Sequence, residues 1–205
     1  MIPPSTFAFF LTTSIALVII PGPNHLYITA RGLAQGRTAG LASALGVETG
    51  TLVHIAAATA GLSYVISQSA TLFSIVKWAG VAYLVYLGIR AFTSGRHEDA
   101  GAPAPQPLRK VFLEGMLVNM LNPKTALFFL ALLPAFVDPA AGSPTLQVVV
   151  FGFTLLLMGT ISDLVYAYMA GALGRRLARR AATLRYVSGF VYLGLGVITA
   201  FAGRK

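Results

Sequence analysis

The stretch Pro21-Gly22-Pro23-Asn24 interrupts an apolar run that otherwise extends from Phe7 to Ile28. Each proline removes a backbone donor and costs roughly 3 kcal/mol in a helix interior, so a helix is expected to break here. Inside a membrane, the backbone groups that such a break frees cannot stay unpaired, and irregular backbone is tolerated only where protein covers it or where it lines a wet cavity. The stretch therefore predicts a broken membrane helix beside a binding site.

A second apolar segment is interrupted in the same way, at Asn119-Met120-Leu121-Asn122-Pro123-Lys124. Many secondary transporters hold their substrates between two broken helices that come from the two halves of the chain. The matched pair of interruptions therefore indicates a secondary transporter, with both stretches at its substrate site.

The composition is that of an integral membrane protein. Of the 205 residues, 56% are hydrophobic and only 10% are charged, whereas roughly a quarter of the residues of a soluble domain are charged. About six apolar segments, each long enough for a hydrocarbon core of roughly 30 Å, fill nearly the whole chain and leave no soluble domain. The net charge of +9 comes largely from short loops, which is typical of membrane proteins and argues against nucleic-acid binding.

Hydropathy predicts an all-α protein with six membrane helices in two sets of three. They are expected at residues 5–30 with the break after residue 20, 38–62, 72–92, 110–137 with the second break, 145–173 and 186–201. A linker rich in Pro, Ala and Gly, residues 94–109, separates a first repeat, residues 1–93, from a second repeat, residues 110–205. Gly46 and Gly50 have the spacing of small residues that lets a neighbouring helix approach closely.

Basic residues follow the first, third and fifth predicted helices. Arg31 and Arg37 lie in the expected loop after the first helix, and five arginines between residues 175 and 185 lie after the fifth. Basic loops tend to stay in the cytoplasm, so both termini are expected outside it. Lysine and arginine at the C-terminus favour the opposite orientation with less weight. The start of the chain lacks the basic region of a cleaved signal peptide, so the first helix is expected to remain.

The two halves of the chain resemble each other. Residues 80–84 reappear as residues 189–193, residues 51–54 resemble residues 163–166, and Pro23-Asn24 corresponds to Pro123-Lys124. A repeat of three helices must enter the membrane upside down the second time. We therefore expect a 3+3 inverted repeat with the substrate near the midplane and alternating access by rocking of one half against the other.

At these residues the chain resembles the LysE/RhtB family of amino-acid exporters, which carry a Pro-Gly-Pro motif near the end of the first membrane segment and an Asn-Pro-Lys motif in the fourth. The resemblance covers nearly the whole chain. It implies efflux of amino acids or close derivatives across a bacterial inner membrane, driven by the proton motive force and without ATP, and no phosphate-binding loop argues otherwise. Several relatives carry an acid where this chain has Thr51, and Glu48 lies one turn earlier, so the acid has moved or the substrate preference differs.

Four ionisable residues in the predicted membrane helices are candidates for substrate binding and proton coupling, because such groups are costly there: Glu48, His54, Lys124 and Asp163. Thr51 shares a helix face with Glu48 and His54 and extends this polar stripe. Each residue also has a structural alternative. Helix-to-helix hydrogen bonds could explain Glu48, and polar packing could explain His54. A permanent ion pair with Asp163 or Glu48 could explain Lys124, and a pair with Lys124 or an arginine could explain Asp163.

The two breaks supply the remaining candidates for the substrate site, which are Pro21, Gly22, Pro23, Asn24, Asn119, Asn122 and Pro123. The three asparagines could bond either the freed backbone groups or the substrate. We expect a substrate carboxylate to meet Lys124 and the positive helix N-termini beyond Pro23 and Pro123. The amino group and the coupling proton would then go to Asp163 and Glu48. Asp163 is preferred because its helix is expected to face the Asn-Pro-Lys segment.

An enzyme and a passive channel are the alternatives to a transporter. The chain has no HExxH or GxSxG motif and no cysteine, which argues against catalysis, disulfides and iron–sulfur clusters, and no metal or other cofactor is expected. A channel, or efflux of another small solute or cation, stays open because broken helices also build pores. The expected partners are an amino acid, protons and membrane lipids, with a homo-oligomer as a further option. Trp78, Tyr83, Tyr86 and Tyr192 fit packing or the membrane interface better than substrate contact.

Overall fold

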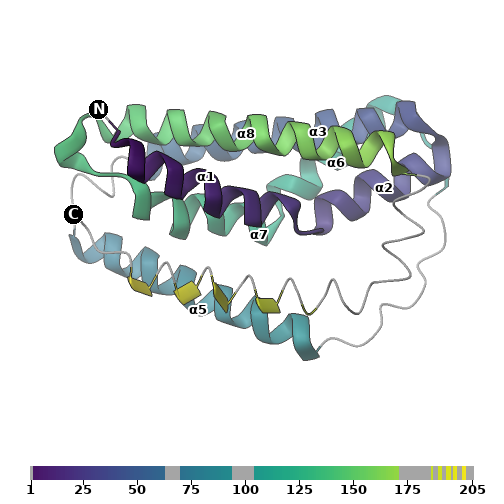
Figure 1. Cartoon of the computed structure of the whole chain (residues 1–205). Coiled ribbons are helices and arrows are strands. Elements are labelled where there is room, and N and C mark those ends of the chain that lie inside the picture. Colours follow the sequence, from purple (N-terminus) through teal and green to yellow (C-terminus); the bar gives the residue numbers. More distant parts are fainter. Residues whose placement is uncertain are drawn as a thin grey trace.

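The computed structural model describes residues 2–62, 70–93 and 104–170, and nine positions between residues 186 and 201. These parts contain helices and no strand. The elements are α1 (Pro4–Ile19), α2 (Pro23–Gln35), α3 (Arg37–Ala57), η1 (Ala58–Leu62), α5 (Ala70–Thr93), α6 (Leu108–Met120), α7 (Pro123–Leu127), η2 (Phe128–Leu132), η3 (Leu133–Phe136), η4 (Pro139–Ala141) and α8 (Pro144–Tyr168). In Figure 1, α1, α3, α6 and α8 run roughly parallel to one long axis, and α5 lies beside them. The all-α prediction is confirmed for the described residues.

Both predicted helix breaks are present. The axis bends by 45° between α1 and α2, and by 44° between α6 and the segment Pro123–Phe136. After each bend the new helix has proline at its first position, Pro23 in α2 and Pro123 in α7. Proline is favoured at this position because its missing N–H would have no partner there, and its fixed φ suits the first turn. The prolines therefore both end one helix and begin the next.

Two helical segments can cross a membrane by length and composition, residues Arg37–Gly61 and Pro144–Tyr168, each with 25 residues. Each bent pair also qualifies if it counts as one span, which raises the number to four within the described residues. The helix α5 has 24 residues, and all nine described positions between 186 and 201 are helical. Within the described residues the chain is thus all-helical, with the long apolar helices of a membrane protein.

One predicted loop is wrong. The helix after the first break does not end near Ala30 but continues to Gln35, so Arg31 lies inside α2 and is buried. The turn to α3 consists of Gly36 alone, with φ at 84°, a conformation that favours glycine. Arg37 is already the first residue of α3. Arg96 of the linker and the arginines after α8 lie outside the described residues, whereas Arg109, predicted to end the linker, already belongs to α6.

The close helix approach predicted at Gly46 and Gly50 is confirmed. A Cβ atom at Gly50 would lie 2.8 Å from the carbonyl oxygen of Met116, and one at Gly46 would collide with the backbone of Phe112. Only glycine therefore lets α3 contact α6 at this distance. Close contact between small residues is the usual way in which membrane helices gain packing energy, since lipid tails are as apolar as the side chains.

Aromatic rings fill the space between α1, α8 and η3. The ring centroid of Phe10 lies 4.5 Å from that of Phe151 and 5.3 Å from that of Phe136, the latter edge to face. Phe128 meets Phe10 from η2 at 5.9 Å. All four rings are buried. This aromatic core holds α1 against the second half of the chain on one side of the two breaks.

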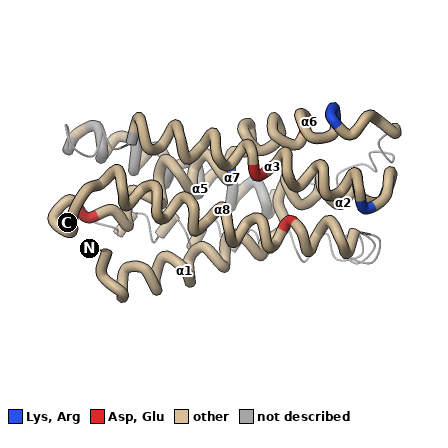
Figure 2. Tube along the Cα trace, turned by 90° about the horizontal axis from the view of Figure 1, so that it is seen from above, with Lys and Arg blue, Asp and Glu red and all other residues tan. Residues whose placement is uncertain are grey.

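At the other end of the bundle, Arg31 joins α2 to α6 and to the end of the linker. Its guanidinium donates to Glu114 Oε2 at 2.7 Å and to the carbonyl oxygen of Ala104 at 3.0 Å. Gln35 donates to the carbonyl oxygen of Gln106 at 2.7 Å. Figure 2 shows basic residues at this end, near the labels of α2 and α6. The start of the second half of the chain is therefore fixed to the end of α2.

The helix α5 packs beside η2 and contacts the last helical segment. The ring of Phe92 lies 5.1 Å from that of Phe190. Trp78 and Tyr86 are more than half exposed on α5, as an interface or lipid-facing aromatic residue would be. The side chains of Tyr83 and Tyr192 lie outside the described residues.

Candidate functional site

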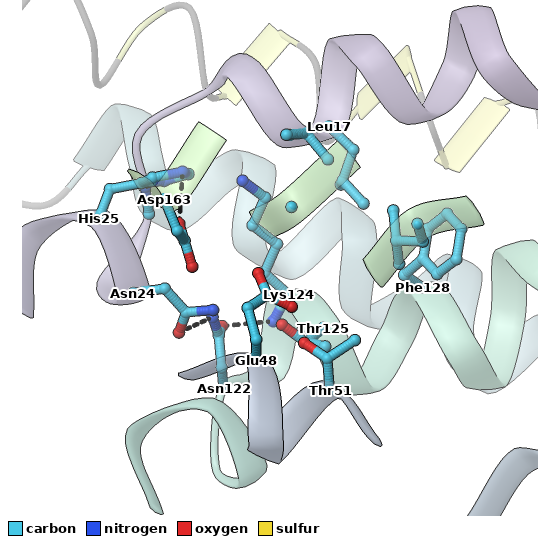
Figure 3. A pocket seen from close by; sticks show the side chains of 14 residues that line it. Leu17, Asn24, His25, Glu48, Thr51, Asn122, Lys124, Thr125, Phe128 and Asp163 are labelled. Carbon is cyan, nitrogen blue, oxygen red and sulfur yellow. Dashed lines mark hydrogen bonds and ion pairs between the residues drawn. The ribbon is translucent and has the colours of Figure 1, made fainter. Parts of the chain in front are cut away.

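A cavity lies between the two helix breaks and is closed by α3 and α8. It encloses about 520 Å³, including the space at its open side. Figure 3 shows its polar side chains converging, and they come from α2, α3, α7 and α8 and from Asn122 before α7. The residues that line it are Leu17, Val18, Gly22, Asn24, His25, Glu48, Thr51, Asn122, Lys124, Thr125, Phe128, Leu155, Gly159 and Asp163. Seven of the sequence-predicted site residues are thus brought together: Gly22, Asn24, Glu48, Thr51, Asn122, Lys124 and Asp163.

Lys124 enters the cavity from the second break and bonds the first. It is buried, and its Nζ donates to the carbonyl oxygen of Ile20 at 2.8 Å. Ile20 is the C-cap of α1, where unpaired carbonyls give the helix a partial negative charge that a cation stabilises. Among the described residues no carboxylate oxygen lies within 4.0 Å of Nζ. The permanent ion pair with Asp163 or Glu48 is therefore not formed here.

Glu48 and Asp163 lie within hydrogen-bond reach of each other, one from α3 and one from α8. The carboxylate of Glu48 has room only because residue 159 is glycine, since a Cβ atom there would lie 2.8 Å from Oε1. Thr51 lies within hydrogen-bond reach of Glu48. Oε2 of Glu48 is buried and receives no hydrogen bond from the residues that the structure describes. The pair can accept a cation or share a proton.

His25 connects this acid pair to the first break. Its Nε2 lies 3.4 Å from Asp163 Oδ1 and 3.2 Å from Ser162 Oγ. Its Nδ1 accepts a hydrogen bond of 3.2 Å from the backbone N–H of Gly22, the N-cap of α2. The ring packs against that of Tyr166, with centroids 4.1 Å apart and the ring planes tilted by 36°. The site thus contains a buried histidine that the sequence analysis did not single out.

The reason for preferring Asp163 as the coupling acid was wrong in one respect. The helix α8 packs mainly against α1, α2 and α3, all from the first half, rather than against the Asn-Pro-Lys segment. Asp163 therefore contacts His25 of the first break. It shares the cavity with Lys124 without pairing with it.

Three asparagines hold the two breaks together. The amide of Asn119 donates to Val47 O at 2.6 Å and to Thr51 Oγ1 at 2.8 Å, and its oxygen accepts from Asn24 Nδ2 at 2.9 Å and from Thr125 Oγ1 at 2.8 Å. This uses its full hydrogen-bonding capacity, so Asn119 serves the protein and leaves no group for a substrate.

Asn122 bonds both the opposite break and its own helix. Its Nδ2 donates to Asn24 Oδ1 at 2.8 Å, and its Oδ1 accepts from the backbone N–H of Lys124 at 3.0 Å. The second bond caps α7. A substrate would therefore find little free donor capacity at this helix end, which weakens the predicted role of the α7 N-terminus. Asn24 keeps one amide hydrogen and faces the cavity.

His54 and Pro21, Pro23 and Pro123 do not line the cavity. His54 stacks on Phe129 with ring centroids 5.7 Å apart, and its Nε2 lies 3.1 Å from the carbonyl oxygen of Asn119. This is the polar packing that the sequence analysis set against a proton shuttle. The prolines act through the backbone, because they start α2 and α7 and create the bends.

Seven cavity residues were missed from the sequence, of which four are apolar and the other three are His25, Thr125 and Gly159. A signal for His25 was available. It is the third residue after Gly22, and a polar side chain at the third position of a helix can reach back to the N-cap N–H. Thr125 and Gly159 carry no such signal, because their roles depend on partners from other helices.

The sequence profile of the LysE type translocators matches residues 15–203. A homoserine/homoserine lactone efflux protein of Salmonella typhimurium is 30% identical to the chain over 200 residues, which cover 96% of each protein. Uncharacterized membrane proteins of Vibrio cholerae and Bacillus subtilis are 29% and 28% identical over 94% of this chain, and over 95% and 97% of their own lengths. No solved structure matches the chain significantly.

Proposed function

Because the chain belongs to the family of LysE type translocators, we propose that it exports amino acids or close derivatives across a bacterial inner membrane, driven by the proton motive force. Members of this family are membrane translocators and not enzymes. One observation carries the proposal furthest. A buried cation, Lys124, and an acid pair, Glu48 and Asp163, face the same cavity without neutralising each other by direct contact. A zwitterion needs such an arrangement.

The substrate class that we propose is a small zwitterionic amino acid of the homoserine type. The Salmonella typhimurium relative is named for efflux of homoserine and its lactone, and it is similar to this chain over nearly its full length. The cavity offers the hydroxyl groups of Thr51 and Thr125 in addition to its charges, and a hydroxyl of the substrate can exchange hydrogen bonds with such groups. A cationic amino acid is a second candidate, since two carboxylates face one lysine.

In the proposed complex, the substrate carboxylate lies at Lys124 and at the N-terminus of α2. The 13 residues of α2 supply a helix dipole whose positive end meets the cavity at Gly22. The substrate ammonium lies at Glu48 and Asp163, where Oε2 of Glu48 lacks a donor. Proton uptake by these acids would remove the partner of the ammonium and release the substrate.

We also propose that the two halves form an inverted repeat and alternate access to the cavity by rocking. Two observations support this. The two bends differ by only 1°, at 45° and 44°. In addition, the halves bond each other crosswise: His54 meets the carbonyl oxygen of Asn119 just before the second break, and Tyr166 meets that of Ile19 just before the first, at 3.5 Å. His54 and Tyr166 occupy matching positions in the sequence repeat.

Purified protein in proteoliposomes tests the proposal. With labelled homoserine as the probe, an imposed pH gradient should drive net efflux, and excess unlabelled homoserine should drive counterflow without a gradient. Asp163→Asn should abolish efflux driven by the pH gradient and retain counterflow. Glu48→Gln should weaken efflux driven by the gradient. The matched control is Asp138→Asn, because Asp138 caps η4 far from the cavity and asparagine can still cap. If both cavity variants export at the parental rate with unchanged pH dependence, the coupling mechanism is wrong.

A passive channel is the alternative that the same vesicles decide. A channel would conduct ions and show neither saturation nor counterflow.

The orientation of the protein in the membrane is tested with single cysteines, since the chain has none of its own. We expect an impermeant reagent to label a cysteine at position 142 in intact cells and not one at position 101. The reverse pattern would show that the proposed orientation is upside down.

A further inference from the structure

The first break is closed by a side chain that can take up a proton. The N–H of Gly22 donates to Nδ1 of His25, so this nitrogen must carry a lone pair and no hydrogen. In the neutral ring, the hydrogen then sits on Nε2, which points to Asp163 Oδ1 and Ser162 Oγ. His25 is buried, and both of its nitrogens are engaged. Its two bonds therefore connect the start of α2 to an acid of the cavity.

Protonation changes both bonds at once. A charged imidazole carries hydrogen on both nitrogens, so Nδ1–H would face the N–H of Gly22, donor against donor. The cap must then open. At the same time, the bond from Nε2 to Asp163 becomes an ion pair, which is shorter and stronger than a neutral hydrogen bond. A capped α2 and a charged His25 exclude each other.

We propose that His25 couples proton binding in the cavity to the geometry of the Pro21–Pro23 break. A proton on His25 releases the N-cap of α2 and occupies Asp163, the acid that would otherwise receive the substrate ammonium. Proton and substrate thus compete for one carboxylate, as antiport requires. This inference rests on the proposed export function, and it adds a positioning residue that acts on substrate through Asp163 and Gly22.

The titratable groups that face His25 determine how readily its ring takes up a proton. Asp163 and Tyr166 lie against it from α8, and Glu48 reaches it from α3 through Asp163. Lys124 lies across the cavity on α7 and opposes a second positive charge. A substrate carboxylate on Lys124 would reduce this opposition, and a substrate ammonium on Asp163 would remove the partner of the charged ring. Occupancy of the cavity therefore changes whether His25 holds a proton.

Two substitutions separate the two bonds. In His25→Asn the amide oxygen can replace Nδ1 and accept from Gly22 N–H, but the side chain is too short to reach Asp163. In His25→Gln the amide nitrogen can replace Nε2 and donate to Asp163, but the cap is lost. Neither variant can take up a proton. A merely structural histidine would be replaced well by at least one of them.

In proteoliposomes with labelled homoserine, we expect both variants to keep counterflow within about threefold of the parent and to lose at least about tenfold of the efflux driven by a pH gradient. The pH dependence of counterflow should become weaker, because only the acids Glu48 and Asp163 of the cavity can still take up a proton. His97→Asn is the control, because it removes a histidine of the linker and should leave both measurements unchanged. If His25→Asn keeps gradient-driven efflux at the parental rate and pH dependence, His25 only caps α2, and the inference is wrong.

A spectroscopic measurement tests the link between protonation of His25 and the N-cap of α2 without measuring transport. In protein labelled with ¹⁵N at glycine and histidine, the amide resonance of Gly22, assigned from its absence in Gly22→Ala, should follow the titration of the His25 ring across the pH range in which the protein stays folded. Asp163→Asn should shift the titration curve of the Gly22 amide and that of the His25 ring by the same amount. A Gly22 resonance that stays constant while His25 titrates, or a His25 ring that does not titrate in this range, would overturn the inference. If the resonances move together but no vesicle exports homoserine, the export proposal fails and the proton-sensitive cap stands.

Discussion

The two helix breaks bend the chain by the same angle but are closed by different chemistry. At the first break, the carbonyl oxygen of Ile20 is paired with Lys124 and the N–H of Gly22 with His25. At the second break, the oxygen of Asn122 caps its own helix, and Asn119 and Asn122 bond across to the other half. The first break therefore depends mainly on groups that can carry charge, and the second mainly on amides that cannot, with His54 at the carbonyl oxygen of Asn119 as the exception.

This difference assigns a distinct role to each break. Amide hydrogen bonds do not change between about pH 4 and 10, so the second break keeps one set of partners whatever the proton supply. Lysine and histidine lose or gain hydrogen-bond donors when they titrate. In a transporter that rocks between two states, the second break would be the fixed hinge and the first the part that responds.

The largest expected effect is that of Asn119→Leu. It removes four hydrogen bonds and leaves two half-buried donors, Asn24 Nδ2 and Thr125 Oγ1, without their acceptor, at about 1–3 kcal/mol each. The free energy of unfolding should fall by about 3 kcal/mol or more, measured by thermal unfolding in detergent. Thr49→Val is the control, since Thr49 bonds only its own helix at the surface. If the second break is a fixed hinge, the Asn119→Leu protein that still folds should show the same pH dependence of homoserine transport as the parent.

Lys124→Met should come next. Methionine has similar length but cannot donate to Ile20 O, and a hydrogen bond to a charged group is worth about 1.5–3 kcal/mol. Homoserine counterflow should therefore fall by about tenfold to a hundredfold, because the cation for the substrate carboxylate is lost as well. Lys110→Met should be silent, since Lys110 is exposed and lies 4.0 Å from Glu114. Unchanged counterflow in Lys124→Met would show that Lys124 does not bind the substrate carboxylate.

Gly159→Ala should have a moderate effect on the responsive side of the cavity. The new Cβ atom would lie 2.8 Å from Oε1 of Glu48, so the carboxylate must shift. Displacement of this kind costs about 1 kcal/mol, and we expect the half-saturating concentration of homoserine to rise by about fivefold. Gly61→Ala is the matched control, because a Cβ atom there meets nothing within 4 Å. An equal effect of both substitutions would mean that helix packing and not Glu48 is responsible.

The smallest expected effects compare the crosswise bonds before the two breaks. His54→Phe removes a bond of 3.1 Å to Asn119 O and should cost about 0.5–1.5 kcal/mol of stability. Tyr166→Phe removes a long contact of 3.5 Å to Ile19 O and keeps the ring that packs against His25, so it should cost less than about 0.5 kcal/mol. Thermal unfolding of the two variants gives the order. A larger cost for Tyr166→Phe would contradict the hydrogen-bond geometry described here.

The sequence was sufficient to find the breaks, because proline and asparagine in an apolar run have few other uses. Pro23 and Pro123 mark the first residues of α2 and α7 as predicted. The rarity of charge in membrane helices likewise led to Lys124, Glu48 and Asp163, which the structure brings to one cavity.

The pairings could not be predicted, because they depend on how distant helices meet. Arg31 was placed in a loop, since a charged residue ends a hydropathic segment. Its partner Glu114 lies 83 residues further along the chain and makes a buried position possible. The same holds for His25, whose acid Asp163 comes from α8. Local pattern gives the helices and their ends, and only the packing decides which polar groups meet.

The attachment of the linker has a consequence for how such a protein can change over time. Arg31 and Gln35 hold residues 104–106 through main-chain carbonyl oxygens, which every amino acid possesses. These two hydrogen bonds therefore do not depend on which side chains stand at residues 104–106, and substitutions there can accumulate without loss of the attachment.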